Sequence, residues 1–313
     1  MSEVAGRAHS IPRRAHTFRH SPFDSAIQTS VSAIGKSGKR RKANEEFVAK
    51  IVSIHSFHGG TGKSNIAANL AAALASAGSR VAVVDADLHS PGVHILFGLS
   101  SEQTPCTLNC YLWGECSIDK AVYNVTDTLQ QSYKVSLNGG EVFVIPASMR
   151  PGQIARISRE GYSASRLNDG LFDLIADLRL DYLLVDTHPG VDEETLLSIA
   201  VSDVLLLTMR PDKQDFQGAG VALELVRRHD VGQILILLNE IPGELNRTSL
   251  REKVESAYQI EVAAMFALSA EMAGLASGGI FLFRHPRDDF SNEIVRLSRL
   301  VAQPELEREK LAV

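Results

Sequence analysis

A glycine-rich segment at residues 56–65, Ser-Phe-His-Gly-Gly-Thr-Gly-Lys-Ser-Asn, combines residue types that bind phosphate. It follows the apolar run Ile51–Ile54 and precedes an alanine-rich helical pattern. Glycines let the backbone turn and bring its N–H groups close to phosphate oxygens, and the positive dipole end of the following helix favours the same charge. Lys63 can contact the β- and γ-phosphates, and the hydroxyl of Ser64 can bind Mg²⁺. The segment therefore predicts a phosphate-binding loop, and the alternative is a glycine-rich turn before a helix.

Carboxylates follow two further apolar runs. Asp85 and Asp87 come after Val81–Val84, and Asp186 comes after Tyr182–Val185. One carboxylate of the first pair can hold Mg²⁺ through water, while the other can orient a water molecule for in-line attack on a γ-phosphate. An Asp at the end of an apolar strand can also reach Mg²⁺ through water. The alternative for each carboxylate is a polar strand end, cap or turn residue.

The elements that position these side chains alternate between short apolar runs and amphipathic stretches beyond residue 46. This alternation predicts an α/β fold with a mostly parallel sheet flanked by helices on both faces. Ligands of such sheets bind beyond the carboxyl ends of the strands, so the loop and the carboxylates should meet at one edge. Further predicted strands are Val142–Ile145, Val204–Leu207 and Ile234–Leu238, and the predicted helices are residues 63–77, 214–228 and 247–257.

The glycine-rich loop resembles the deviant Walker A motif, K-G-G-x-G-K-[ST], of the MinD/ParA ATPases, with His58 in place of the first lysine. Asp85-Ala-Asp87 resembles switch I of that family, and Asp186-Thr-His-Pro-Gly190 resembles its switch II. The resemblance covers about residues 48–302. It implies a single P-loop NTPase domain that binds ATP and Mg²⁺, dimerises face to face around two nucleotides and hydrolyses ATP slowly.

The resemblance also implies roles for individual side chains. Asp87 is expected to position or activate the attacking water, and Lys63 is the second expected catalytic residue. Ser64 is expected to bind Mg²⁺ directly, and Asp85 and Asp186 to hold it through water. The residues expected to contact the nucleotide are Gly59, Gly60, Thr61, Gly62, Lys63, Ser64, Asn65, Asn239 and Pro211.

Two of these nucleotide contacts lie far from the loop in the sequence. Asn239 ends an apolar run, at a place where the family has an amide that hydrogen-bonds an adenine edge, and a plain turn residue is the alternative. Pro211 belongs to a segment, Met209–Asp212, that follows a strand as a family loop near the nucleotide does.

Composition favours an ordinary globular protein, because 44% of the 313 residues are hydrophobic and 22% are charged. No run approaches the roughly 18–20 apolar residues of a membrane-spanning helix. The N-terminus lacks the apolar core of a secretion signal, which favours a cytoplasmic protein.

The charge is unevenly distributed along the chain. Residues 1–44 contain nine Lys or Arg and two Asp or Glu, a balance of +7, whereas residues 45–313 have a balance of −12. We predict a disordered basic arm at residues 1–45, an ATPase domain at 46–303 and a short tail at 304–313. The arm could contact nucleic acid, acidic lipid or an acidic partner, and the alternative is a solubilising tail.

The three cysteines, Cys106, Cys110 and Cys116, lie in one stretch. An odd number in a long intracellular chain argues against a disulfide framework, and their spacing matches no common zinc site. We expect buried apolar thiols.

The chain lacks the C-x-x-C of the family's iron–sulfur carriers, and residues 304–313 have little apolar face for a membrane-targeting helix. The remaining prediction is an ATP-dependent homodimer that positions or partitions a chromosome, plasmid or protein assembly and is stimulated by a protein partner. The alternative is a nucleotide-gated binding module with negligible turnover. His58 motivates that alternative, because the family's first lysine reaches the phosphates of the other subunit. Other cations could replace it, and the candidates are Arg150, Arg156 and Arg210.

Overall fold

The computed structural model describes residues 49–229 and 231–302, so the predicted arm and tail lie outside the described residues. Within these ranges eight strands form one sheet in the order β3-β4-β2-β5-β1-β6-β7-β8. Neighbouring strands are parallel except for β3 and β4. The strands are β1 Lys50–His55, β2 Arg80–Ala86, β3 Tyr123–Asn124, β4 Glu141–Ile145, β5 Tyr182–Thr187, β6 Val204–Met209, β7 Gln233–Ile241 and β8 Val262–Ala267.

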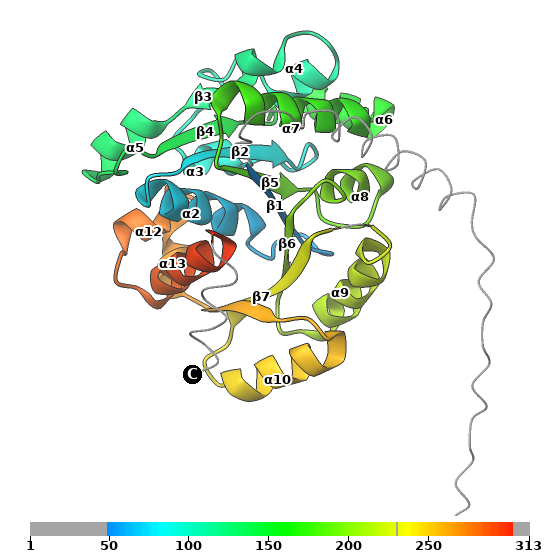
Figure 1. Cartoon of the computed structure of the whole chain (residues 1–313), viewed down its shortest axis with the longest axis vertical. Coiled ribbons are helices and arrows are strands. Elements are labelled where there is room, and N and C mark those ends of the chain that lie inside the picture. The colour runs from blue at the N-terminus through cyan, green and yellow to red at the C-terminus, as the bar shows by residue number, and fades with distance from the viewer. Residues whose placement is uncertain (1–48, 230, 303–313) are drawn as a thin grey trace, which may run out of the picture.

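Helices cover both faces of this sheet, which confirms the predicted fold class (Figure 1). The helices α2, α12 and α13 pack on one face, and α7, α8, α9 and α10 lie on the other. Their bounds are α2 Lys63–Ser76, α3 Val93–Leu96, α4 Leu108–Leu112, η1 Ile118–Ala121, α5 Thr126–Tyr133, α6 Pro151–Glu160, α7 Ala164–Leu178, α8 Glu193–Ile199, α9 Lys213–Val226, α10 Arg247–Tyr258, α11 Ala270–Leu275, α12 Phe281–Arg284 and α13 Asp289–Ala302.

Strand β2 illustrates why the middle of an inner strand is a continuous apolar run. Val81 and Val83 belong to the core beneath α2, whereas Ala82 and Val84 belong to the core beneath α7. Successive side chains of a strand point to opposite faces, so a strand covered on both faces is apolar at most positions, and its buried polar residues, such as Asp85, are hydrogen-bonded. These four side chains are fully buried.

The strand order brings the predicted site together. Strand β1 lies between β5 and β6, and β2 lies on the far side of β5. The loops that follow β1, β2 and β5 therefore leave the same edge of the sheet side by side. The register pairs Asp85 directly with Asp186, and Ile54 with Asp186 on the other side.

No helix within the described residues combines the length and the apolar character needed to cross a lipid bilayer.

Candidate functional site

The glycine-rich loop connects β1 to α2. Gly60 and Gly62 have φ angles of 75° and 86°, in the left-handed region that favours glycine. At Gly62 an added Cβ would also lie 2.3 Å from Nδ2 of Asn239, so a side chain does not fit there. Helix α2 begins at Lys63 without a side-chain cap. Its first N–H groups therefore point toward the loop as donors for an anion.

Lys63 lies buried beside the loop. Its Nζ donates to Ser56 Oγ over 3.0 Å, and Ser56 Oγ in turn donates to the carbonyl oxygen of His58. Burial lowers the pKa of Lys63, while the negative charges of Asp186 and Asp87 act in the opposite direction. A buried ammonium group among carboxylates and glycine N–H groups can stabilise the charge of a bound phosphate.

Asp85 and Asp186 form a pair of buried carboxylates next to Ser64. Ser64 Oγ donates to Asp186 Oδ2 over 2.6 Å, and Asp85 Oδ2 accepts from the backbone N–H groups of Gly92 and Val93. The second oxygen of each carboxylate, Oδ1, is buried without a hydrogen-bond partner. Burial, together with the charge of Asp186, raises the pKa of Asp85 well above its usual range, and burial raises the pKa of Asp186 to about 6.

This pair fits a Mg²⁺ ion. Two buried carboxylates with free oxygens repel each other, and a bound divalent cation relieves both the repulsion and the missing contacts. The donors are all oxygens, which are the ligands that Mg²⁺ prefers. Ser64, Asp85 and Asp186 are thus able to hold the ion expected from the sequence.

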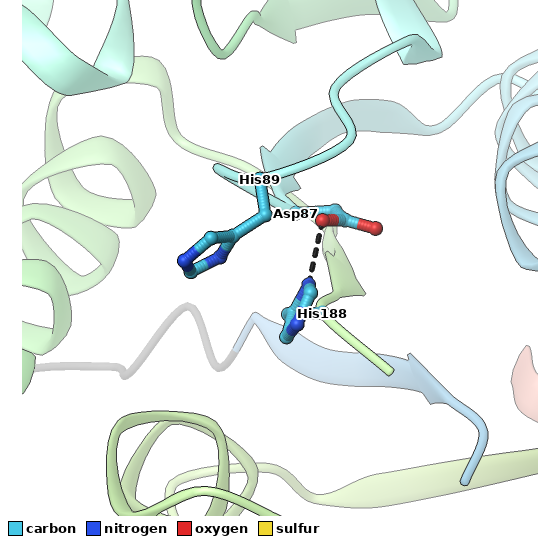
Figure 2. A group of neighbouring side chains, drawn as sticks. All are labelled: Asp87, His89 and His188. Carbon is cyan, nitrogen blue, oxygen red and sulfur yellow. Dashed lines mark hydrogen bonds and ion pairs between the residues drawn. The ribbon is translucent and has the colours of Figure 1, made fainter. Parts of the chain in front are cut away.

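Asp87 lies at the outer side of this group. Its Oδ1 accepts from Nδ1 of His188 over 2.7 Å and from the backbone N–H of Ser90 over 3.0 Å (Figure 2). Burial raises the pKa of Asp87, but the contacts with His188 and Ser90 outweigh burial and leave the pKa below its ordinary value. Asp87 is therefore an ionised acceptor, as a residue that orients a water molecule must be.

Asn239 lies on the other side of the loop. Its Nδ2 donates to the carbonyl oxygen of Thr61 over 2.9 Å. Asn239, Gly62 and Asn65 line a pocket of about 290 Å³. The rest of that wall is largely apolar, as a site for a planar base requires, and consists of Ile66, Glu240, Ala267, Leu268, Ser269, Met272, Ala273, Ala276, Ser277 and Phe290. Pro211 is half-buried after β6 and is not among these residues.

His58 is linked to helix α9. Its Nδ1 donates to Asp215 Oδ1 over 2.8 Å, and the other oxygen of Asp215 accepts from the backbone N–H and Nε of Arg210. Of the other two proposed replacement cations, Arg156 binds Glu115, and Arg150 is exposed. Among the three arginines named from the sequence, Arg210 thus shares Asp215 with His58, and its charge is already compensated by that carboxylate.

Sequence reasoning did not identify His188 or His55 as residues of this site. His55 ends β1, and its Nδ1 lies 2.8 Å from Thr187 Oγ1, which donates to the carbonyl oxygen of Ile54. Burial and the charge of Lys63 lower the pKa of His55 to about 3, so this histidine is neutral. The available signal for His188 was its place between Thr187 and Pro189 in the switch II motif.

The cysteines depart from the prediction. Cys110 is buried as expected, but Cys106 and Cys116 are only partly buried because they lie in the loops around α4. All three are free thiols, and none belongs to the three-residue metal-ligand cluster found within the described ranges.

Known proteins resemble this chain in sequence and in fold. The family model ParA, described as an NUBPL iron-transfer P-loop NTPase, matches residues 47–129. An uncharacterised ATP-binding protein of Methanocaldococcus jannaschii is 28% identical over 215 residues, which are 69% of this chain and 73% of that protein. The septum site-determining protein MinD of Synechocystis is 25% identical over 206 residues, or 66% of this chain and 70% of that protein. The structure of MinD complexed with Mg-ADP from Pyrococcus horikoshii shares the fold, with a TM-score of 0.66 and 19% identity over 82% of this chain and 97% of that chain.

Proposed function

We propose that this chain, which belongs to the MinD/ParA family of P-loop NTPases, binds ATP together with Mg²⁺ and hydrolyses the ATP slowly. The observation that carries the proposal is the pair Asp85 and Asp186 beside Ser64. Both carboxylates are buried, each has an unpartnered oxygen, and both lie next to a loop built to receive phosphate.

The side chains divide the chemistry among them. Lys63 and the N–H groups at the start of α2 bind the phosphates and compensate their charge. Ser64, Asp85 and Asp186 would hold Mg²⁺, which when bound neutralises charge on the β- and γ-phosphates. Asp87 accepts a hydrogen bond from the attacking water, and the contact with His188 keeps its carboxylate ionised and fixes its orientation.

The base of the nucleotide would occupy the pocket next to Asn239. The Asn239 amide can both donate and accept hydrogen bonds on an adenine edge. Its bond to Thr61 holds the amide against the loop, so that base and phosphates bind to one connected surface. Pro211 is proposed only as part of the neighbouring loop after β6.

We further propose that ATP joins two copies of the chain and that hydrolysis, stimulated by a protein partner, separates them. Such a dimer would position or partition a chromosome, plasmid or protein assembly in the cytoplasm. The likeness to MinD supports this class of function. Transfer of an iron–sulfur cluster, which the description of the matching family model suggests, is not proposed because the chain has no C-x-x-C.

The test compares the wild-type chain with Asp87→Ala. Losing the group that orients the water should lower single-turnover hydrolysis of bound ATP about 100-fold or more, whereas ATP affinity should change little because Asp87 is not expected to bind the phosphates. Removal of Mg²⁺ with EDTA should abolish hydrolysis in both proteins. Equal hydrolysis by wild type and Asp87→Ala would exclude the catalytic role of Asp87.

The second candidate is a nucleotide-gated binding module with negligible turnover. The hydrogen bond between His58 and Asp215 favours it. His58 stands where the family has the lysine that reaches the other subunit, but here its side chain is bonded to helix α9 of the same chain. The single-turnover experiment separates the candidates: bound ATP that stays intact while dimers form supports the binding module.

A further inference from the structure

Three side chains converge at the outer side of the proposed ATP site. Asp87 and His89 lie on the loop after β2, and His188 lies on the loop after β5 (Figure 2). Each offers one ligand atom, and these atoms all lie within 4.8 Å of one another. The two imidazole rings lie side by side, with centroids 4.6 Å apart and planes inclined by 42°. His89 has no role in the chemistry proposed above.

We propose that Asp87, His89 and His188 bind a first-row transition-metal cation such as Zn²⁺, at a site distinct from that of Mg²⁺. Imidazole nitrogen is a good ligand for Zn²⁺ and its neighbours in the series, whereas Mg²⁺ prefers oxygen. The chain thus offers two kinds of donor set side by side: oxygens at Ser64, Asp85 and Asp186, and two imidazoles with one carboxylate at the outer cluster.

The surroundings of the cluster favour a cation. His89 and His188 line a pocket of about 360 Å³ whose wall also contains Tyr162, Asp192 and Glu194. Asp192 and Glu194 add two acidic side chains to this wall, next to the carboxylate of Asp87. The pocket has room for water to complete the coordination of an ion held by three side chains, as in open metal sites.

Little movement is needed to form the site. Nδ1 of His188 already lies 2.7 Å from Asp87 Oδ1, to which it donates a hydrogen bond. A cation between these two atoms would take the place of that hydrogen, and the ring proton would move from Nδ1 to Nε2. Ligand atoms around a tetrahedral Zn²⁺ lie roughly 3.3 Å apart, so the exposed side chain of His89 must move by only about an ångström or two to complete the set.

Metal binding would have a consequence for hydrolysis. A cation bound at Oδ1 of Asp87 would withdraw negative charge from the carboxylate and weaken its hydrogen bond to the attacking water, so an occupied site would slow the hydrolysis of bound ATP. This consequence rests on the proposed ATPase function, whereas binding of the metal does not.

The binding test titrates the full chain with Zn²⁺ in the absence of nucleotide, by calorimetry. We expect one equivalent per chain, with affinity at least about 10-fold weaker in His89→Ala and in His188→Ala. A matched control replaces the arm histidines His9, His16 and His20 by alanine and should bind as wild type does. Absence of binding, or equal binding in wild type and both site variants, would overturn the proposal.

Co²⁺ identifies the ligands in the same proteins. Its visible spectrum should lack the intense thiolate band that coordination by the cysteines would produce. The spectrum should also be lost in His89→Ala. A thiolate band that persists in His89→Ala would place the metal on the cysteines and contradict the assignment.

The effect on turnover is measured with Mg-ATP at a buffered concentration of free Zn²⁺. The hydrolysis rate of wild type should fall at least about 10-fold at saturating Zn²⁺, while the rate of His89→Ala should stay at its own zinc-free value over that range. Zn²⁺ binding, together with no hydrolysis of Mg-ATP by wild type in the absence of Zn²⁺, would reject the proposed ATPase function but support the metal site. Hydrolysis of Mg-ATP without any binding of Zn²⁺ would support the ATPase function and reject the metal site.

Discussion

His58 connects the start of the glycine-rich loop to helix α9. The imidazole is 37% exposed, yet it bonds to Asp215, whose side chain is only 2% exposed and which also holds Arg210. The carboxylate is buried among donors, and their contacts outweigh the effect of burial and lower its pKa. Asp215 is therefore a fixed anchor that holds the start of the loop to α9.

Replacing His58 by lysine tests whether the charge at this position limits dimer formation. A lysine is longer and always charged at neutral pH, so His58→Lys should tighten the ATP-dependent dimer about 10-fold, by roughly 1.4 kcal/mol. The measurement is sedimentation velocity with ATP in an Asp87→Ala background. His58→Gln is the matched control, because it can keep the bond to Asp215 without a charge. Unchanged dimer affinity in His58→Lys would point to another cation, such as the exposed Arg150.

His94 is expected to make folding stability depend on pH. It is 2% exposed on α3, its Nδ1 has no hydrogen-bond partner, and burial lowers its pKa from the ordinary value of 6.5. Below pH 6.5 the unfolded chain takes up a proton that folded His94 resists, so the free energy of unfolding falls with falling pH. The loss is at most about 1.4 kcal/mol per pH unit between 6.5 and the folded pKa.

We therefore expect His94→Leu to lose less stability than wild type between pH 7 and pH 5, as measured by urea unfolding. His285→Leu, at an exposed position, is the control and should leave the pH dependence unchanged. The same slope in wild type and His94→Leu would show that other groups carry the pH dependence.

At the scale of elements, the loop is supported by close packing against α9. Gly218 lies on this helix, and an added Cβ would lie 2.3 Å from the ring of Phe57, two residues before the first glycine of the loop. Gly220, on the same helix, has no atom closer than 3.8 Å to such a Cβ. The two glycines therefore share a backbone conformation but differ in what surrounds them.

This difference defines a matched pair of variants. Gly218→Ala should lower the free energy of unfolding by about 1–3 kcal/mol and weaken ATP binding, because Phe57 must move with the loop. Gly220→Ala should be neutral or stabilise by up to about 1 kcal/mol, since alanine favours helix. Urea unfolding and ATP titration check both. Equal stability of the two variants would refute the role of the Phe57 contact.

Some strands and helices could be predicted from the sequence and others could not. The inner strands were predicted correctly because they are covered on both faces and therefore read as nearly continuous apolar runs. The edge strand β8, Val262–Ala267, was missed because alanines and a methionine give it little β-branched character. Helices α6 and α7 were not predicted, although Leu167, Leu171 and Leu174 recur at helical spacing on the buried face of α7.

The candidate site, too, could be predicted only in part from the sequence. The positions of Asp85 and Asp186 followed from the rule that ligands bind at the carboxyl ends of parallel strands, and the register places these residues opposite each other. The contact between Asp87 and His188 could not be predicted, because it joins residues 101 positions apart through side-chain orientations. The sequence likewise could not show that Oδ1 of Asp85 and Oδ1 of Asp186 lack hydrogen-bond partners, because this depends on how the surrounding side chains pack.

For the whole molecule, the distribution of charge separates two activities. Residues 45–313 carry a net charge of −12 and would therefore repel DNA and acidic lipid, whereas residues 1–44 carry +7. The nucleotide site involves described residues within 45–313 alone. Contact with an acidic partner and binding of ATP should therefore be separable by deleting the arm.

Deletion of residues 1–44 should weaken binding to DNA and shift its salt dependence, while ATP affinity stays within about 2-fold of wild type. Each phosphate contact that is lost should reduce the slope of log K against log salt by about 0.9. A finer variant replaces the cluster Lys39, Arg40, Arg41 and Lys42 by alanine and should lose most of the same slope. Fluorescence anisotropy with a labelled duplex and with a fluorescent ATP analogue measures both affinities. If the deletion variant binds DNA and acidic partners as the full chain does, the arm is a solubilising tail.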